Sequence, residues 1–263
     1  MPYAQLDNIC LHYEEHGHGE PLLFLHGFTL DHRMWQPQVA FFSDAYRVIL
    51  LDSRGHGLSD APATGYSRPE RVKEILKFLD YLRIDHVHLI GLSMGGSLGM
   101  GVAFEHQDRL KSLTLVSTGA AGYDIGKKFS RLDTIAKEKG IEVVKREWLR
   151  VIESWYGHEL SDVKELMVTM INDHTGAIWS DPMRGKYPPS PPDVDDAHKI
   201  TVPTCIFSGL EDKVFVPLAR LLHERIKGSV LHEYEGVGHM LNLEASERFN
   251  RDLAAFLSGL SSR

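Results

Sequence analysis

Cysteine is scarce in this chain, which has only Cys10 and Cys205 among its 263 residues. Each lies in a strand-like run, where a cysteine usually packs as a small buried hydrophobic side chain, so we expect two free thiols and no disulfide. The sequence also lacks an apolar run of the ~20 residues that a membrane-spanning helix needs. The first residues lack the basic start and apolar stretch of a signal peptide. These absences predict a cytoplasmic protein.

Positive charge is in deficit, because 29 Lys and Arg residues face 36 Asp and Glu residues, for a formal net charge of −7. This balance disfavours binding to nucleic acid or to an anionic membrane through a general electrostatic field. The 43% of hydrophobic residues and the 25% of charged residues are ordinary for a globular protein and exclude disordered and fibrous classes. At this length we expect one core domain that carries an insertion.

Short, continuous apolar runs alternate with segments of helical period. The runs predict strands that are covered on both faces, at residues 21–25, 47–52, 87–92, 113–116 and 204–208. Apolar residues recur with the period of a helix in segments 69–82, 216–227 and 246–260. This alternation predicts an α/β fold, a parallel sheet with helices on both faces and with ligands beyond the carboxyl ends of the strands. Residues 9–16, which alternate weakly before the turn residues 17–21, predict an opening hairpin at the sheet edge.

One segment, residues 119–199, breaks the alternation. It has helical patterns but no strand-like run, and five prolines lie between residues 181 and 192. We interpret it as a helical cap inserted into a core domain made of residues 1–118 and 200–263. Caps of this kind cover a site and shape its substrate pocket.

Residues 87–96, VHLIGLSMGG, predict a buried strand that runs through a tight turn into a helix. The apex of such a turn is strained, so the positions two before and two after it must be small, and Gly91 and Gly95 meet that demand. Ser93 at the apex fits the G-x-S-x-G pattern, in which the serine hydroxyl stands exposed above the sheet. We therefore predict that Ser93 is a nucleophile.

A serine nucleophile needs a base that takes its proton and a carboxylate that orients the base. His239 is the predicted base, because it lies in the loop after the last predicted strand, on the same rim as Ser93. Asp212 is the predicted carboxylate, because it follows the strand at 204–208 and gives the order Ser, Asp, His. Glu211 beside it and Asp124 beyond the preceding strand are the competing acids.

Two amide donors complete the predicted site by binding the oxygen of a tetrahedral intermediate. One is the amide of Met94, directly after the nucleophile, and the other is most simply that of Phe28, in the loop after the strand at 21–25. His26 in that loop is an alternative base, but its place on the oxyanion side favours a structural role.

With these motifs the chain resembles the α/β-hydrolase superfamily over essentially its whole length. The matching residues are His26-Gly27-Phe28, the loop from Asp52 to Asp60, Gly91 to Gly96, Asp212 and Gly238-His239. The resemblance implies a mostly parallel eight-stranded sheet and a structural role for the loop from Asp52 to Asp60, with Arg54 and Asp60 pinning its turn.

Within the superfamily, Ser93 argues against haloalkane dehalogenases and epoxide hydrolases, whose nucleophile is an aspartate. The stretches 91–96 and 238–244 resemble 3-oxoadipate enol-lactonases and small carboxylesterases. C–C bond hydrolases of aromatic degradation are close neighbours, although many carry a large aromatic residue where this chain has Met240.

The leading prediction is a serine hydrolase that cleaves a carboxylic ester or lactone through an acyl-enzyme, without cofactor or metal. The alternatives are a C–C bond (meta-cleavage product) hydrolase, a perhydrolase or cofactor-free haloperoxidase, and a hydrolase-fold ligand receptor with little turnover. The partner would be a small-molecule substrate, and the sequence leaves the oligomeric state open.

Substrate identity depends on the predicted cap. The aromatic residues that would either line its pocket or pack inside it are Trp148, Trp155, Tyr156, Trp179 and Tyr187. The candidate cations for a substrate carboxylate are Lys127, Lys128, Arg131, Lys145, Arg146 and Arg184.

Overall fold

The structure is a computed structural model that describes residues 2–123, 127–155, 157, 161–183, 186 and 193–261, with the backbone alone described at 127–130 and 261. Its strands are β1 (Tyr3–Leu6), β2 (Ile9–His16), β3 (Glu20–Leu25), β4 (Tyr46–Leu51), β5 (Val87–Leu92), β6 (Leu110–Val116), β7 (Thr204–Gly209) and β8 (Val230–Tyr234). Its α-helices are α1 (Gln36–Phe42), α2 (Arg68–Tyr81), α3 (Met94–His106), α4 (Lys127–Lys139), α5 (Ile141–Glu153), α6 (Ser161–Asp173), α7 (Ala177–Ser180), α8 (Asp193–Asp196), α9 (Val216–Arg225), α10 (Leu241–Glu244) and α11 (Ser246–Ser261). Three short 3-10 helices are η1 (His32–Trp35), η2 (Gln107–Arg109) and η3 (Ala197–Lys199).

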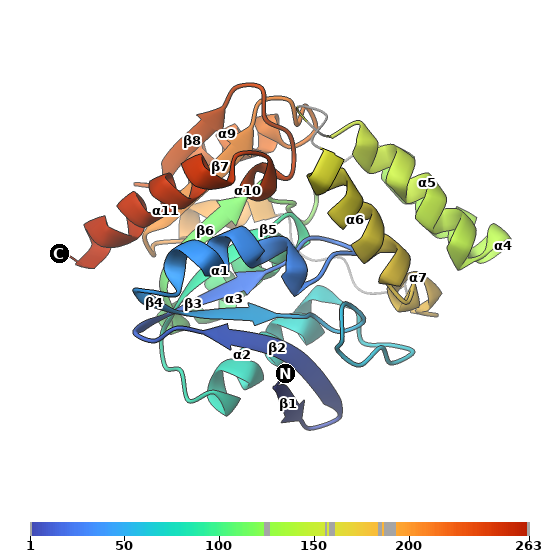
Figure 1. Ribbon diagram of the computed structural model, residues 1–263, viewed down its shortest axis with the longest axis horizontal. Coiled ribbons are helices and arrows are strands. Elements are labelled where there is room, and N and C mark those ends of the chain that lie inside the picture. The colour runs from blue at the N-terminus through green and yellow to red at the C-terminus, as the bar shows by residue number, and fades with distance from the viewer. Residues whose placement is uncertain are drawn as a thin grey trace.

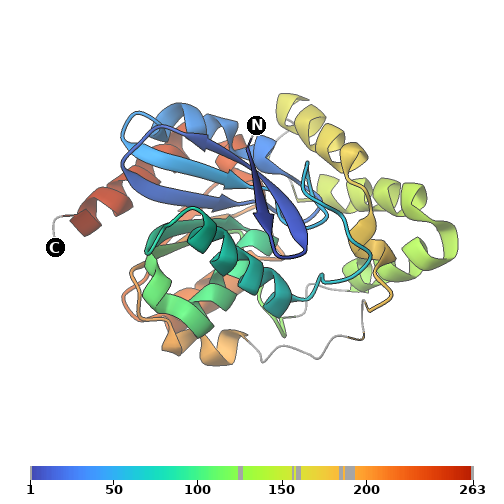
Figure 2. The same ribbon diagram turned by 90° about the horizontal axis from the view of Figure 1, so that it is seen from below.

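The strands form one eight-stranded sheet in the order β1-β2-β4-β3-β5-β6-β7-β8. The pairs β1–β2 and β2–β4 are antiparallel, and every pair from β4–β3 to β7–β8 is parallel. Helices α1 and α11 lie on one face of the sheet, and α2, α3 and α9 lie on the other (Figures 1 and 2). The predicted mostly parallel α/β-hydrolase sheet is therefore confirmed.

The central strands are apolar throughout because helices cover both of their faces. Leu22, Leu23, Phe24 and Leu25 of β3 are all 0% exposed. Helix α3 can lie close to the sheet because its face there carries glycine. A Cβ on Gly99 would come within 2.7 Å of Leu89 and 3.0 Å of Leu113.

An opening hairpin does lie at the sheet edge, but its strands differ from the predicted ones. It is made by β1 and β2, which pair from Tyr3 opposite His12 to Leu6 opposite Ile9. The turn at 17–21 does not pair β2 with β3, because β4 lies between them in the sheet. Both thiols are free, as expected, and burial raises the pKa of Cys205.

The segment between β6 and β7 holds helices α4 to α8 and η3, and the described part of it has no strand. Figure 1 shows α4 to α7 gathered at the end of the sheet toward which the arrow of β4 points. Most of the proline-rich stretch, residues 184, 185 and 187–192, lies outside the described residues. Among the described helices, none is long and apolar enough to cross a membrane.

Candidate active site

Ser93 occupies the junction between β5 and α3 in a strained backbone conformation. Its φ is 53° and its ψ is −108°, a region that residues other than glycine rarely adopt. Its amide donates to the Val116 carbonyl at 2.9 Å, and its carbonyl accepts from Ser97 at 3.1 Å and from Gly119 at 3.2 Å. These bonds to β6, α3 and the loop after β6 hold the apex in place.

The two flanking glycines are required by close backbone contacts. A Cβ on Gly91 would collide with the backbone of Gly95, and one on Gly95 would collide with the carbonyl of Leu25 at the end of β3. The turn is therefore tight enough to bring Ser93 against the loop that follows β3. An ideal Cβ on Gly27 in that loop would lie 3.8 Å from the Cβ of Ser93.

His239 and Asp212 form a buried pair beyond the carboxyl ends of β8 and β7. His239 Nδ1 lies 2.5 Å from Asp212 Oδ2, and the two residues are 5% and 0% exposed. A hydrogen bond from Nδ1–H to the carboxylate leaves Nε2 with its lone pair, the form in which an imidazole can accept a proton. His239 and Ser93 line the same small cavity, and the structure gives no direct hydrogen bond between these two described side chains.

Aromatic rings flank the imidazole of His239. The ring centroids of Trp155 and Phe215 lie 4.9 Å and 4.8 Å from it. In addition, the backbone amide of His239 donates to the carbonyl of Trp155 at 2.7 Å. The segment inserted between β6 and β7 therefore directly contacts the histidine loop.

The carboxylate of Glu244 holds the loop that carries His239. Its Oε2 accepts from the amides of Gly238 at 2.8 Å and Gly157 at 2.9 Å, and its Oε1 accepts from the amide of Met240 at 3.0 Å. These bonds fix both neighbours of His239 in the chain. Glu244 belongs to the stretch 238–244, which resembles enol-lactonases and small carboxylesterases, but the sequence predicted no role for it.

The loop after β3 is held by its own histidine. His26 Nδ1 lies 2.8 Å from the Gly27 carbonyl, and His26 Nε2 accepts from the Ser53 amide at 3.0 Å. Both ring nitrogens are thus engaged with backbone, and burial lowers the pKa of His26. This arrangement leaves His26 no nitrogen with which to act as a base.

The residue after Phe28 connects this loop to the inserted helices. Thr29 has a φ of 63°, and its Oγ1 donates to the Phe28 carbonyl at 2.6 Å. The same oxygen accepts from the indole Nε1 of Trp148 in α5 at 2.7 Å. The position of Phe28 therefore depends on a residue of the insertion.

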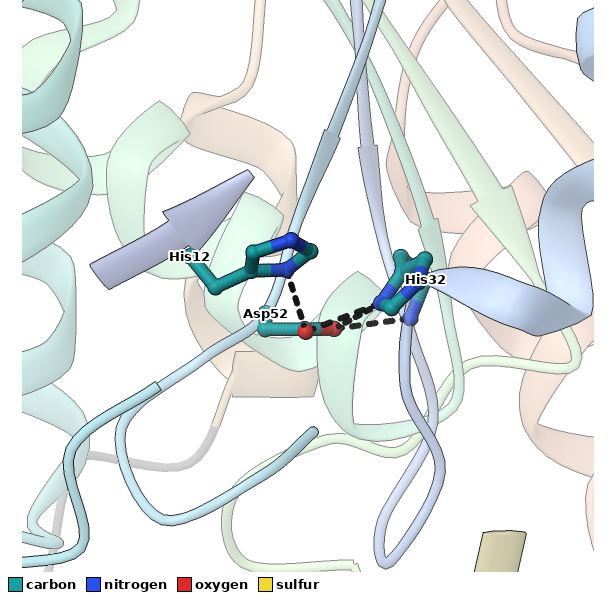
Figure 3. A group of neighbouring side chains, drawn as sticks. All are labelled: His12, His32 and Asp52. Carbon is teal, nitrogen blue, oxygen red and sulfur yellow. Dashed lines mark hydrogen bonds and ion pairs between the residues drawn. The ribbon is translucent and has the colours of Figure 1, made fainter. Parts of the chain in front are cut away.

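Asp52, directly after β4, gathers two histidines around a buried carboxylate (Figure 3). Its oxygens lie 2.8 Å from His12 Nδ1 and 2.9 Å from His32 Nδ1, and they also accept from the amides of His32 at 2.8 Å and Leu58 at 3.1 Å. Burial alone would raise the pKa of Asp52, but the bonds from His12 and His32 outweigh it and hold the pKa well below its usual range. Burial likewise opposes protonation of His32, and the bonds to Asp52 raise its pKa nonetheless.

Among the described residues, His12, His32 and Asp52 are the group whose atoms lie close enough to hold a metal ion, within 4.8 Å of one another. Their mutual hydrogen bonds already use these atoms, so the cluster fits a structural role in anchoring the loop that starts at Asp52. In that loop Arg54 pairs with Glu74 and Asp60 accepts from the amide of Cys10 at 2.8 Å.

Two cavities meet at Ser93. The smaller, about 20 Å³, is lined mostly by apolar side chains together with Ser93 and His239, and that volume suits about one water molecule. The larger, about 260 Å³, runs from Ser93 toward α2 and the loop after β6. Phe28, Trp148 and Trp155 line both.

Of the competing acids, Glu211 pairs with Lys213, whereas His239 pairs with Asp212. Its carboxylate lies 3.1 Å from the exposed Lys213 Nζ, and its side chain is 41% exposed. Asp124 lies outside the described residues.

The aromatic residues predicted for the insertion have different places. Trp148 and Trp155 line the cavities, whereas Trp179 is buried with its ring 5.3 Å from that of Phe28. Tyr156 and Tyr187 lie outside the described residues.

None of the candidate cations whose side chains are described lines either cavity. Arg131 and Arg146 are exposed, and Lys145 donates to the Asn172 carbonyl at 2.8 Å. The side chains of Lys127, Lys128 and Arg184 are outside the described part. The cation that does line the larger cavity is Arg71 of α2. Arg71 was not among the predicted cations, because it lies on α2 and outside the insertion.

Comparisons with known proteins agree with this architecture. The 3-oxoadipate enol-lactonase 2 of Acinetobacter baylyi is 25% identical over 255 residues, which cover 95% of this chain and 94% of that protein. The crystal structure of the enol-lactonase from Burkholderia xenovorans LB400 matches with a TM-score of 0.85 at 26% identity, over 98% of this chain and 100% of that one. A malate-bound thermophilic esterase from Thermogutta terrifontis has a TM-score of 0.85 at 25% identity, over 96% and 94% of the two chains. The profile of the alpha/beta hydrolase family matches residues 22–252, and this chain belongs to that family.

Proposed function

We propose that this protein is a serine hydrolase that cleaves a carboxylic ester or a lactone through an acyl-enzyme. The observation that carries the proposal is the 2.5 Å contact between His239 Nδ1 and the fully buried Asp212 carboxylate, beside a cavity that His239 shares with Ser93. The enol-lactonases and the esterase among its relatives act on the same type of bond.

In the proposed reaction Ser93 Oγ attacks the carbonyl carbon and its proton passes to His239 Nε2. The hydrogen bond between these two groups would form as substrate binds, since catalytic hydrogen bonds are often loose in the free enzyme. Asp212 stabilises the imidazolium and keeps the ring in the required orientation. The amides of Phe28 and Met94 would donate to the oxyanion of the tetrahedral intermediate. Met94 N–H has no carbonyl partner within α3, because Met94 is the first residue of that helix.

Collapse of the intermediate breaks the carbon–oxygen bond to the alcohol, which takes the proton from His239. Water then gives a proton to His239 and attacks the acyl carbon, and Ser93 leaves with that proton as the acid is released. In a lactone the alcohol and the acyl group belong to one molecule, so the alcohol stays on the enzyme with the acyl group and the second step releases a hydroxy acid.

We also propose that residues 119–199 act as a cap on a core of residues 1–118 and 200–263. The bond from Trp148 to Thr29 and the bond from His239 to Trp155 support this, because both connect the insertion to loops of the site. Aromatic cover of this kind excludes water and strengthens the electrostatic contacts inside.

The test compares wild type with Ser93→Ala in the hydrolysis of p-nitrophenyl esters of increasing acyl length and of an enol-lactone. We expect turnover of short esters that falls to background in the variant, whose thermal unfolding should match wild type. Turnover that survives in Ser93→Ala would refute the proposed nucleophile. A wild type inactive on every compound would refute the ester or lactone activity.

A further inference from the structure

The larger cavity beside Ser93 combines apolar walls with a single type of charge. Apolar residues such as Phe28, Trp148 and Ile178 form much of its lining, together with residues 119–121. Arg71 is the charged side chain among the described residues that line it. A cation at the wall of a partly enclosed apolar cavity interacts more strongly with an anion than it would in water.

The guanidinium of Arg71 contacts the residue that follows Ser93, and both Arg71 and Ser93 line the larger cavity. Arg71 lies in the first turn of α2, and its Nη1 is 2.8 Å from Met94 Sδ at the start of α3. Met94 directly follows Ser93. A thioether sulfur is a weak hydrogen-bond acceptor, so this contact helps to orient the guanidinium.

A guanidinium in this position matches a carboxylate. Its planar fork donates two parallel hydrogen bonds to the two oxygens of a carboxylate, and such charge-assisted pairs are the stronger ones. Ser97 also lines the cavity, and a serine side chain carries a further hydrogen-bond donor. The net charge of −7 gives an anion no general attraction to this protein, so binding it requires a local cation.

The two cavities differ in what they can accept. The smaller, at about 20 Å³, has no room for a carboxylate-bearing arm, whereas the larger, at about 260 Å³, has room for a short chain or a small ring. We propose that Arg71 binds a carboxylate of the substrate, so that the preferred esters or lactones are compact anions whose carboxylate lies in the larger cavity. This inference rests on the proposed hydrolase function and specifies its substrate class.

The experiment uses two matched pairs of esters that place a carboxylate on either side of the bond to be cleaved. On the acyl side, p-nitrophenyl hydrogen glutarate is compared with p-nitrophenyl valerate, which has an acyl chain of equal length. On the alcohol side, 4-carboxyphenyl butyrate is compared with phenyl butyrate. The readout is the ratio of kcat/KM, carboxylated over neutral, in each variant relative to wild type, because the intrinsic reactivities of the esters then cancel.

Arg71→Met removes the charge and keeps an unbranched side chain, Arg71→Lys keeps the charge without the fork, and Lys73→Met removes a charge from the exposed side of the same helix. In at least one pair we expect Arg71→Met to lower the ratio about 10- to 100-fold, mainly through KM, as for the loss of a charge-assisted hydrogen-bonded pair. Arg71→Lys should recover part of the ratio, and Lys73→Met should leave it unchanged. A ratio that Arg71→Met leaves unchanged in both pairs, even if both members slow equally, would overturn the inference.

The behaviour of the wild-type protein distinguishes failure of the proposed function from failure of this inference. If wild type hydrolyses none of the esters, calorimetric titration with glutarate and with its uncharged diamide, glutaramide, still decides the inference. Tighter binding of glutarate that is lost in Arg71→Met would support it, and equal binding of both compounds by wild type would overturn it.

Discussion

Replacing Glu244 by glutamine should loosen the loop that carries His239. The carboxylate accepts three backbone amides, from Gly157, Gly238 and Met240, at 2.8–3.0 Å. In Glu244→Gln the remaining oxygen can serve the Gly157 and Gly238 amides, but the new NH₂ group then faces the Met240 amide, donor against donor.

The magnitude follows from the change of acceptor. Hydrogen bonds to a charged group contribute about 1.5–3 kcal/mol each and neutral ones about 0.5–1.5 kcal/mol, so two weakened bonds and one lost bond sum to about 5 kcal/mol. For a chain of this size that corresponds to a fall in melting temperature of roughly 10–20 °C. Because Gly238 and Met240 adjoin His239, we also expect kcat for ester hydrolysis to fall about 10- to 100-fold, as for an imidazole displaced by a fraction of an ångström to one ångström.

The assay is thermal unfolding together with steady-state kinetics on a short p-nitrophenyl ester. Glu247→Gln is the matched control, because the Glu247 side chain is 91% exposed and lies 3.9 Å from Arg251. Its effect on melting temperature and kcat should be close to zero. A Glu244→Gln variant that melts and turns over like this control would refute the role assigned to the three amide bonds.

Three further predictions concern other contacts of the site. Burial lowers the pKa of His56 well below 6.5 and that of His174 to about 3, so below pH 6.5 these two imidazoles bind more protons in the unfolded chain than in the folded one. The free energy of unfolding should therefore fall by about 1.4 kcal/mol per pH unit for each imidazole between pH 6.5 and 5; urea unfolding checks this, and a flat or rising profile would contradict it. Trp148→Phe removes the hydrogen bond to Thr29 Oγ1 and should lower the free energy of unfolding by about 1 kcal/mol. It should also lower kcat/KM, because that bond orients the loop of the proposed oxyanion donor. Urea unfolding and ester kinetics measure the two effects, and unchanged kinetics would contradict a role of this contact in catalysis. Asp212→Asn should lower kcat for a short ester about 10³- to 10⁴-fold with little change in KM. A fall in kcat of less than tenfold would exclude a role of Asp212 in orienting His239.

The features that the sequence predicted well depend on local backbone demands. The strained turn at Ser93 needs small residues at 91 and 95 whatever surrounds it, and the structure has the predicted strand, turn and helix there. The long helices were also predictable, since the segment expected at 69–82 is α2 at Arg68–Tyr81. Periodicity suffices where one face of a helix is buried along its whole length.

The features that the sequence missed depend on contacts between distant segments. Weak alternation at 9–16 indicated a hairpin, but only the sheet order shows that β4 separates β2 from β3. Arg71 stands outside the apolar stripe of α2, so it resembled any solvated cation until the fold brought it to the cavity. The bond between Trp148 and Thr29 joins residues 119 positions apart, and no local pattern carries it.

The central claim is that Ser93 is a nucleophile activated by His239, and covalent labelling tests it most directly. Wild type and Ser93→Ala are incubated with diethyl p-nitrophenyl phosphate, and intact mass and peptide mapping locate the product. We predict one diethylphosphoryl group per wild-type chain, attached to Ser93, no label in the variant, and much slower labelling in His239→Ala. Label on another residue, or equal labelling of wild type and Ser93→Ala, would contradict the account.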